Sequence, residues 1–214
     1  MDLARNEPAK AQALASTWEK EGGGEGARHC AAVALLSGGQ YDRAAAELES
    51  LAATTARPGA DIKGELFAQA AQAWLIAGDS GKALAAQGRA IDAAGPKTEF
   101  LVDRSIILAS LGRYWEAIDD LGVVLDRDAG RVDALVYRAT AWRHIGNLDL
   151  ALDDARRALK IAPGHLDALL ESGIVRRLQG DAAGAAADWR RLIDIDPRAP
   201  AAAAARENLG RLPK

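Results

Sequence analysis

The chain has 214 residues and a nearly balanced charge, with 27 Lys and Arg against 30 Asp and Glu. This balance argues against a nucleic-acid-binding or membrane-binding surface, because both need a local excess of basic charge. The single cysteine, Cys30, excludes an intrachain disulfide and a thiolate metal cluster. Hydrophobic residues make up 49% of the chain but aromatic residues only 5%, so Ala, Leu, Val and Ile dominate and favour helix.

The segment 1–24 is predicted to form a short helix followed by a linker. Glu7-Pro8 is typical of a helix start, and the glycines between Gly22 and Gly26 are expected to end the helix and form the linker. These glycines lack the Lys-Ser/Thr of a P-loop and follow no predicted strand. Neither a signal-peptide core nor an apolar run long enough to span a membrane is present, so we expect a soluble chain. A signal peptide removed ahead of Met1 would leave no trace.

A glycine followed five positions later by an alanine recurs along the chain. The glycines are equally spaced after the first interval, which is slightly longer: Gly39, Gly78, Gly112, Gly146 and Gly180. Each glycine can end a helix in the left-handed conformation, and the polar residues after it can start the next helix. Seven positions before each glycine stands another small residue: Ala32, Ala71, Ser105, Ala139 and Gly173. Small residues on both helices predict closely packed antiparallel pairs, and Pro163 and Pro197 end the last two.

A helix-turn-helix unit of about 34 residues, with small residues at positions 8 and 20 and proline at position 32, resembles the tetratricopeptide repeat. The resemblance covers residues 25–199. It implies an all-α, right-handed superhelical solenoid of antiparallel helix pairs with about 12 helices. The expected repeats, with an insertion around Pro58 to Lys63, are 25–58, 64–97, 98–131, 132–165 and 166–199. Residues 1–24 would precede them, and residues 200–214 would form a C-terminal capping helix.

Several residues invite a catalytic or metal-binding interpretation. His29 and Cys30 are adjacent, but neighbours on a helix point about 100° apart and cannot converge on one atom. We expect Cys30 to be a small buried or half-buried residue. His144 and His165 lack metal-ligand spacing and are expected at the surface. The tryptophans are expected to pack in the core: Trp18, Trp74, Trp115, Trp142 and Trp189. No metal, cofactor or catalytic residue is therefore predicted.

Paired carboxylates at residues 119–120 and 153–154 occupy the same positions in consecutive repeats, which favours a structural role over acid–base chemistry. The predicted ion pairs join the two helices of one hairpin: Arg104 with Asp120, and Arg138 with Asp154. In the fifth repeat Ser172 replaces the arginine, so Asp188 is expected to lie freer.

The family resemblance implies that the first helix of each pair lines a concave groove. The expected partner-binding residues are Gln72, Glu99, Val102, Ile106, Val136, Thr140, Arg143, Leu170, Ile174 and Arg177. Their apolar members would form a stripe, with acidic residues at one end of the helices and arginines at the other. Alternatively, some pack against neighbouring helices or are covered by the N-terminal segment. Glu99 and Asp103 stand where a chaperone-binding domain of this family has a carboxylate clamp, and they would repel an acidic peptide.

These features predict a non-catalytic scaffold that binds a peptide or helix of another protein in its groove. The alternative is a structural module that self-assembles into homo-oligomers, with the groove filled by the chain itself. No nucleic acid and no membrane insertion are expected. A bias towards Ala and Arg with little Lys indicates a bacterial protein. A loose likeness to exported bacterial repeat proteins favours the periplasm, with the cytoplasm as the alternative.

Overall fold

The computed structural model describes residues 2–55 and 60–212, and within these ranges the chain forms helices and turns without strands. The predicted all-α class of antiparallel helix pairs is confirmed. The predicted end of the first repeat and the start of the insertion fall on residues 56–59, outside the described residues. None of the described helices combines the length and hydrophobicity that a membrane span requires.

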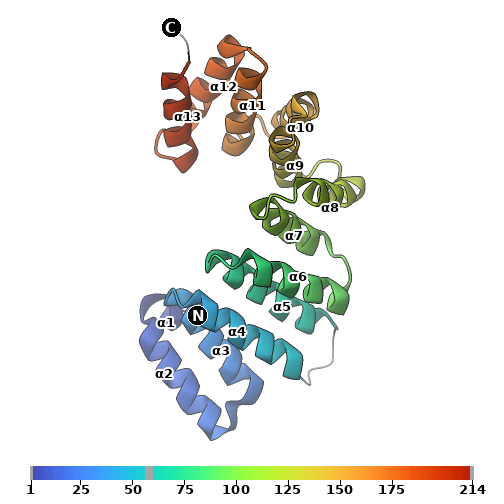
Figure 1. The fold of residues 1–214 in the computed structure, drawn as a ribbon. Coiled ribbons are helices and arrows are strands. Elements are labelled where there is room, and N and C mark those ends of the chain that lie inside the picture. The colour runs from blue at the N-terminus through green and yellow to red at the C-terminus, as the bar shows by residue number, and fades with distance from the viewer. Residues whose placement is uncertain (1, 56–59, 213–214) are drawn as a thin grey trace. The chain divides into compact units, whose positions relative to one another are not determined.

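The chain divides into two compact units, of which the first ends at Leu111. Consecutive helices of this unit pack against one another (Figure 1). Its elements are α1 (Asp2–Asn6), α2 (Pro8–Trp18), the π-helix η1 (Glu19–Gly23), α3 (Gly24–Ser37), α4 (Tyr41–Thr54), α5 (Ala60–Ile76), α6 (Ser80–Ala94) and α7 (Thr98–Ser110). The short helix α1 was not predicted. Where the glycine linker was expected, the chain has a kink between α2 and α3, and Gly22 and Gly24 both have a positive φ there.

The second unit begins at Gly112. Its helices are α8 (Tyr114–Arg127), α9 (Val132–His144), α10 (Leu148–Ile161), α11 (Leu166–Leu178), α12 (Ala182–Ile195) and α13 (Pro200–Gly210). The first helices α9 and α11 contact each other directly, and α13 packs on α11 and α12 as the C-terminal cap (Figure 1). The boundary between the units falls inside the expected third repeat, between α7 and α8.

The repeat glycines terminate helices as predicted. All five have a positive φ, between 72° at Gly112 and 88° at Gly180. This region is strained for any residue with a Cβ, which explains why glycine recurs at this turn. The helix that follows is capped by a side chain in two repeats. Asp79 accepts from the Lys82 N–H and Asp181 from the Gly184 N–H, and these hydrogen bonds lower the pKa of both carboxyls.

Small residues lie at the helix contacts inside each unit. The alanines that follow the repeat glycines are at most 1% exposed: Ala44, Ala83, Ala117, Ala151 and Ala185. In the first unit the core continues through Leu48, Phe67 and Ile107. In the second unit Leu169, Trp189 and Leu192 form a core with the inner face of α13. Close approach of the helices buries these larger side chains between successive pairs.

One predicted ion pair is present inside the second unit. Arg138 of α9 donates two hydrogen bonds to Asp154 of α10, at 2.7 and 2.8 Å. Asp188 does not lie free, so that prediction was wrong. Its carboxylate accepts from the Ser172 hydroxyl at 2.6 Å and pairs with Arg176 at 3.0 Å. Ser172 stands where the two preceding repeats have arginine. Arg176, one turn later in α11, pairs with the Asp188 carboxylate instead.

The other predicted pair joins Arg104 of the first unit to Asp120 of the second and stays a prediction. The tryptophans follow the expected core role only in part. Trp74 and Trp189 are buried and Trp142 is half-buried, whereas Trp18 is 46% exposed and Trp115 is 62% exposed. Trp115 stands edge-on to Trp142, with ring centroids 5.7 Å apart.

Candidate binding pocket between first helices

A pocket of about 360 Å³ lies between α9 and α11 of the second unit. Helix α9 contributes Asp133, Val136, Tyr137 and Thr140 to its wall. Helix α11 and its N-cap contribute His165, Asp167, Leu170 and Glu171. The pocket therefore contains three of the predicted groove residues, because positions 2, 5 and 9 of a first helix lie on one helical face.

The floor of the pocket is apolar and fixed in place. Val136 is only 7% exposed and Leu170 is half-buried, so both anchor their helices as well as line the pocket. The Thr140 hydroxyl donates to the Val136 carbonyl one turn earlier. Tyr137 is 40% exposed and forms the accessible part of the wall. A ligand would meet aliphatic carbon at the base and an aromatic ring at the side.

Arg143 does not stand free for a partner. Its guanidinium donates to Glu171 at 2.5 Å from Nε and 3.3 Å from Nη2, across the contact between α9 and α11. Glu171 is only 5% exposed, so its charge requires this partner. The pair links the two first helices, and Glu171 was not among the predicted residues.

Polar contacts also join neighbouring first helices in the first unit. His29 of α3 lies 3.2 Å from the Gln69 amide oxygen of α5, and Gln72 of α5 donates to Asp103 of α7 at 3.1 Å. The second residue of each pair and Glu171 all occupy position 6 of a first helix. Position 6 of α5, α7 and α11 thus accepts a polar contact from the preceding first helix. The sequence signals these contacts by a polar residue at position 6 in three of the five repeats.

The remaining predicted groove residues differ in accessibility. Val102 is buried, Ile106 and Ile174 are half-buried, and Glu99 is exposed. Ile174 packs against the core beneath α13. Arg177 is half-buried, and its Nε is fully buried without a hydrogen-bond acceptor in the described part of the chain. The expected apolar stripe is therefore partly packing surface. Its continuity from α7 to α9 stays a prediction.

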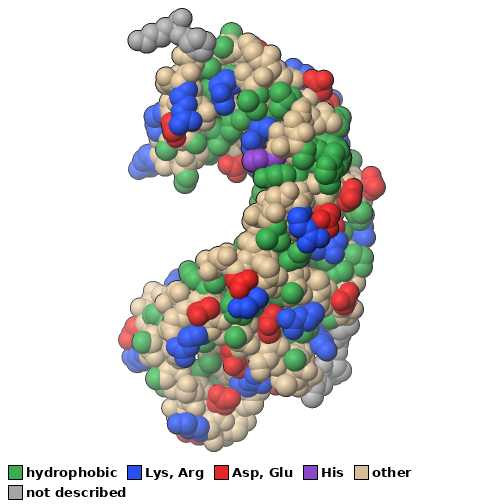
Figure 2. All heavy atoms as spheres, in the orientation of Figure 1, with side chains coloured by type: hydrophobic (Ala, Val, Ile, Leu, Met, Phe, Trp, Pro, Cys, Tyr) green, Lys and Arg blue, Asp and Glu red, His purple; other side chains and the backbone are tan. Residues whose placement is uncertain are grey.

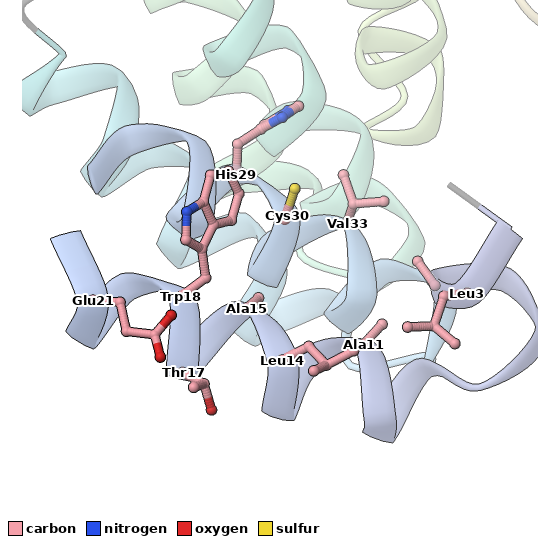
Figure 3. Close-up of a pocket in the computed structure, with 11 residues that line it drawn as sticks. Leu3, Ala11, Leu14, Ala15, Thr17, Trp18, Glu21, His29, Cys30 and Val33 are labelled. Carbon is pink, nitrogen blue, oxygen red and sulfur yellow. The ribbon is translucent and has the colours of Figure 1, made fainter. Parts of the chain in front are cut away.

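A larger pocket, about 480 Å³, lies between α2 and α3 of the first unit (Figure 3). Leu14 and Trp18 of α2 and Cys30 and Val33 of α3 line this pocket (Figure 3). Cys30 is exposed, which corrects the expected burial. Its neighbour His29 bonds to Gln69, and no group of three or more potential metal ligands occurs among the described residues.

Charged side chains of both signs are interspersed over helices α2 to α6 on the face shown in Figure 2. His144 in the second unit stacks on Tyr114, with ring centroids 4.5 Å apart. Burial and the positive charge of Arg143 lower the pKa of His144 below its ordinary value of 6.5. Protonation of His144 is therefore disfavoured relative to a free imidazole.

The tetratricopeptide repeat family model matches residues 167–199. A search of curated proteins finds no match. Among solved structures the chain is similar to YrrB, described as a tetratricopeptide repeat protein with an unusual peptide-binding site. The two share 18% identity over 90% of this chain and 96% of YrrB, with a TM-score of 0.64.

Two further structures show the same likeness. A structure of MamA from Desulfovibrio magneticus, from residue 41 to its end, has 15% identity and a TM-score of 0.70 over 82% of this chain and 97% of that chain. The first repeat domain of Spaghetti, bound to an HSP90 peptide, has 17% identity and a TM-score of 0.53 over 56% of this chain and 95% of that domain. At these identities the likeness establishes the fold.

Proposed function

We propose that this chain is a non-catalytic scaffold that binds a peptide or helix of a partner protein between α9 and α11, because residues 167–199 match the tetratricopeptide repeat model and the fold is similar to solved proteins with this repeat. The observation that carries the proposal is the open pocket with an apolar floor and a polar rim on two adjacent first helices. Pockets of this composition are typical of binding sites.

The comparisons support this choice of function. YrrB is described as having a peptide-binding site, and the Spaghetti domain was solved with a peptide bound. A peptide side chain could enter over Val136 and Leu170, while polar groups on Tyr137 and Thr140 orient its backbone. Because the first helices are tied together by Arg143 and Glu171, the pocket would bind without large rearrangement.

Site-specific photocrosslinking tests the proposal. Tyr137 is replaced by p-benzoylphenylalanine, and the protein is irradiated in a lysate of its source organism. A matched variant carries the same group at Leu150 of α10, which is similarly exposed at 43% but does not line the pocket. We expect a crosslinked partner from position 137, weak or no crosslinking from position 150, and loss of the product when Thr140→Arg fills the pocket.

Circular dichroism must first confirm that each variant is folded. Equal crosslinking from both positions, or a product that survives Thr140→Arg, would place binding elsewhere and contradict the proposal.

Self-association is a second candidate, favoured by one observation. Ile161 of α10 and Ile195 of α12 are 51% and 47% exposed and occupy the same position of successive repeats. Such a pair of apolar side chains can form an interface between copies. Light scattering over a range of concentrations would detect the oligomer. The Ile161→Asp, Ile195→Asp variant should then have a lower mass in solution, whereas Thr140→Arg should leave the mass unchanged.

A further inference from the structure

The charged side chains that line the α9–α11 pocket are all carboxylates. Asp133, Asp167 and Glu171 reach its wall, whereas neither Lys nor Arg does. The apolar floor lies between them. An anionic group would therefore be repelled on entering, whereas a cationic group would be attracted.

Two of the three carboxylates are already neutralised by arginines of the same unit. Asp133 accepts from Arg131 at 2.9 Å, and Glu171 accepts from Arg143 at 2.5 Å. Asp167 has neither a hydrogen bond nor an ion pair within the described part of the chain. Since Asp167 is exposed at the mouth, the pocket presents one uncompensated negative charge beside an apolar floor.

We propose that this pocket binds a Lys or Arg side chain of the partner peptide, an inference that rests on the proposed function. The aliphatic stem would lie on Val136 and Leu170, as long basic side chains do on apolar surfaces. The charged head would reach Asp167, and the ring of Tyr137 offers a cation–π contact beside it. The partner is thus a segment with one basic residue among apolar ones, which distinguishes it from an acidic peptide.

Selection from phage-displayed random dodecapeptides on the whole protein tests this inference. We expect the selected peptides to share a Lys or Arg. Fluorescence polarisation with the best peptide should then show that Asp167→Asn weakens binding about fivefold. The control Asp194→Asn, an exposed carboxylate on α12 outside the pocket, should leave the affinity unchanged. Replacing the peptide's basic residue by Glu should abolish binding to the native protein, and Asp167→Lys should restore it.

The outcomes separate the two proposals. Two outcomes would overturn the basic side-chain inference and leave the proposed function standing. In the first, the selected peptides share no basic residue. In the second, Asp167→Asn leaves the peptide affinity unchanged while Thr140→Arg lowers it. Peptides that bind equally to native protein and Thr140→Arg, or failure to select any peptide, would overturn both proposals. If dimerisation of the chain competes with the peptide, the pocket belongs to a second copy and the inference is likewise overturned.

Discussion

Asp154 is held in the second unit by two guanidinium groups. Arg138 binds it through two hydrogen bonds, and Arg157 approaches to 3.2 Å from the same helix. The Asp154 side chain is 3% exposed and that of Arg138 is 19% exposed, so water screens the pair poorly. The hydrogen bonds that Arg138 donates to Asp154 raise the pKa of Arg138. Such a pair contributes little over an apolar replacement, but removing one member leaves a buried charge.

We therefore predict that Asp154→Asn lowers the free energy of unfolding by about 3 kcal/mol. The neighbouring Asp153→Asn, at an exposed position, should change it by less than about 0.5 kcal/mol. Denaturant titration followed by circular dichroism measures both. A double-mutant cycle with Arg138→Met would show the coupling. Equal effects of the two substitutions would mean that the pair does not stabilise the fold.

The lowered pKa of His144 predicts that the stability of the protein depends on pH. Its pKa in the folded protein is lowered by burial and by Arg143, so protonation favours the unfolded chain. The stability that neutral His144 contributes is fully present when the pH is above 6.5, the ordinary pKa of histidine. It is lost as the pH falls through the pKa of His144 in the folded protein. We expect the melting temperature to fall between about pH 7.5 and pH 5.5, and to fall less in His144→Phe, which keeps the aromatic stack. An identical fall in both proteins would exclude His144 as the cause.

At the scale of helix pairs, Gly173 sets the distance between α11 and α12. A Cβ at this position would overlap Nε1 of Trp189, a side chain that is fully buried and donates to the Leu170 carbonyl. Gly173→Ala should therefore destabilise the second unit by about 1 to 3 kcal/mol, because the tryptophan cannot move aside without breaking its packing. A lowered melting temperature in calorimetry is the expected result.

Gly122, inside α8, provides the matched control. A Cβ there would meet nothing within 4 Å, and its φ is not positive. Gly122→Ala should stabilise the protein by up to about 1 kcal/mol, because alanine loses less backbone entropy in a helix. If both substitutions shifted the melting temperature in the same direction, close packing at Gly173 would not be the explanation.

The helix pairs were predictable because their signals are local. Glycine at each turn and small residues at each contact act within one repeat, and they identify the turn and the facing positions. Contacts between repeats were not predictable in the same way. The pair of Arg143 with Glu171 depends on which side chain of one helix reaches across to the next, and the sequence signals Glu171 only through the polar residues at position 6 of other repeats. Exposure of Trp115 likewise follows from helix packing rather than from its hydrophobicity.

The pocket was predicted in its floor but not in its rim. Val136, Thr140 and Leu170 follow from repeat positions alone. Tyr137 and His165 do not, because one lies at position 6 and the other precedes the helix. The His165 ring accepts the Ala168 N–H and so serves as the N-cap of α11 while lining the pocket. The position of a residue within a repeat predicts which face of a helix it lies on. The rim of a pocket also contains residues from helix caps and turns, which these positions do not predict.

On the scale of the whole molecule, the repeats are organised as two compact units whose boundary follows Leu111. The repeat spacing contains no signal for this division, because Gly78, Gly112 and Gly146 are equally spaced across it. Each unit has its own core. The first unit buries Leu48 and Phe67 among α4 to α6, and the second buries Leu169 and Trp189 beneath α13. In repeat proteins stability arises from such near-neighbour contacts rather than from one central core.

This organisation predicts that residues 112–214 fold without the first unit. The fragment contains α8 to α13, including both members of the ion pairs at Asp154 and Glu171 and the capping helix α13. We expect a helical circular dichroism spectrum and a cooperative thermal transition, which Asp154→Asn should shift downwards as in the full chain. A fragment that is helical but melts without cooperativity, or one insensitive to Asp154→Asn, would show that the core beneath α13 requires the first unit. If the fragment folds, it should also retain the α9–α11 pocket and bind the selected peptides as the full chain does.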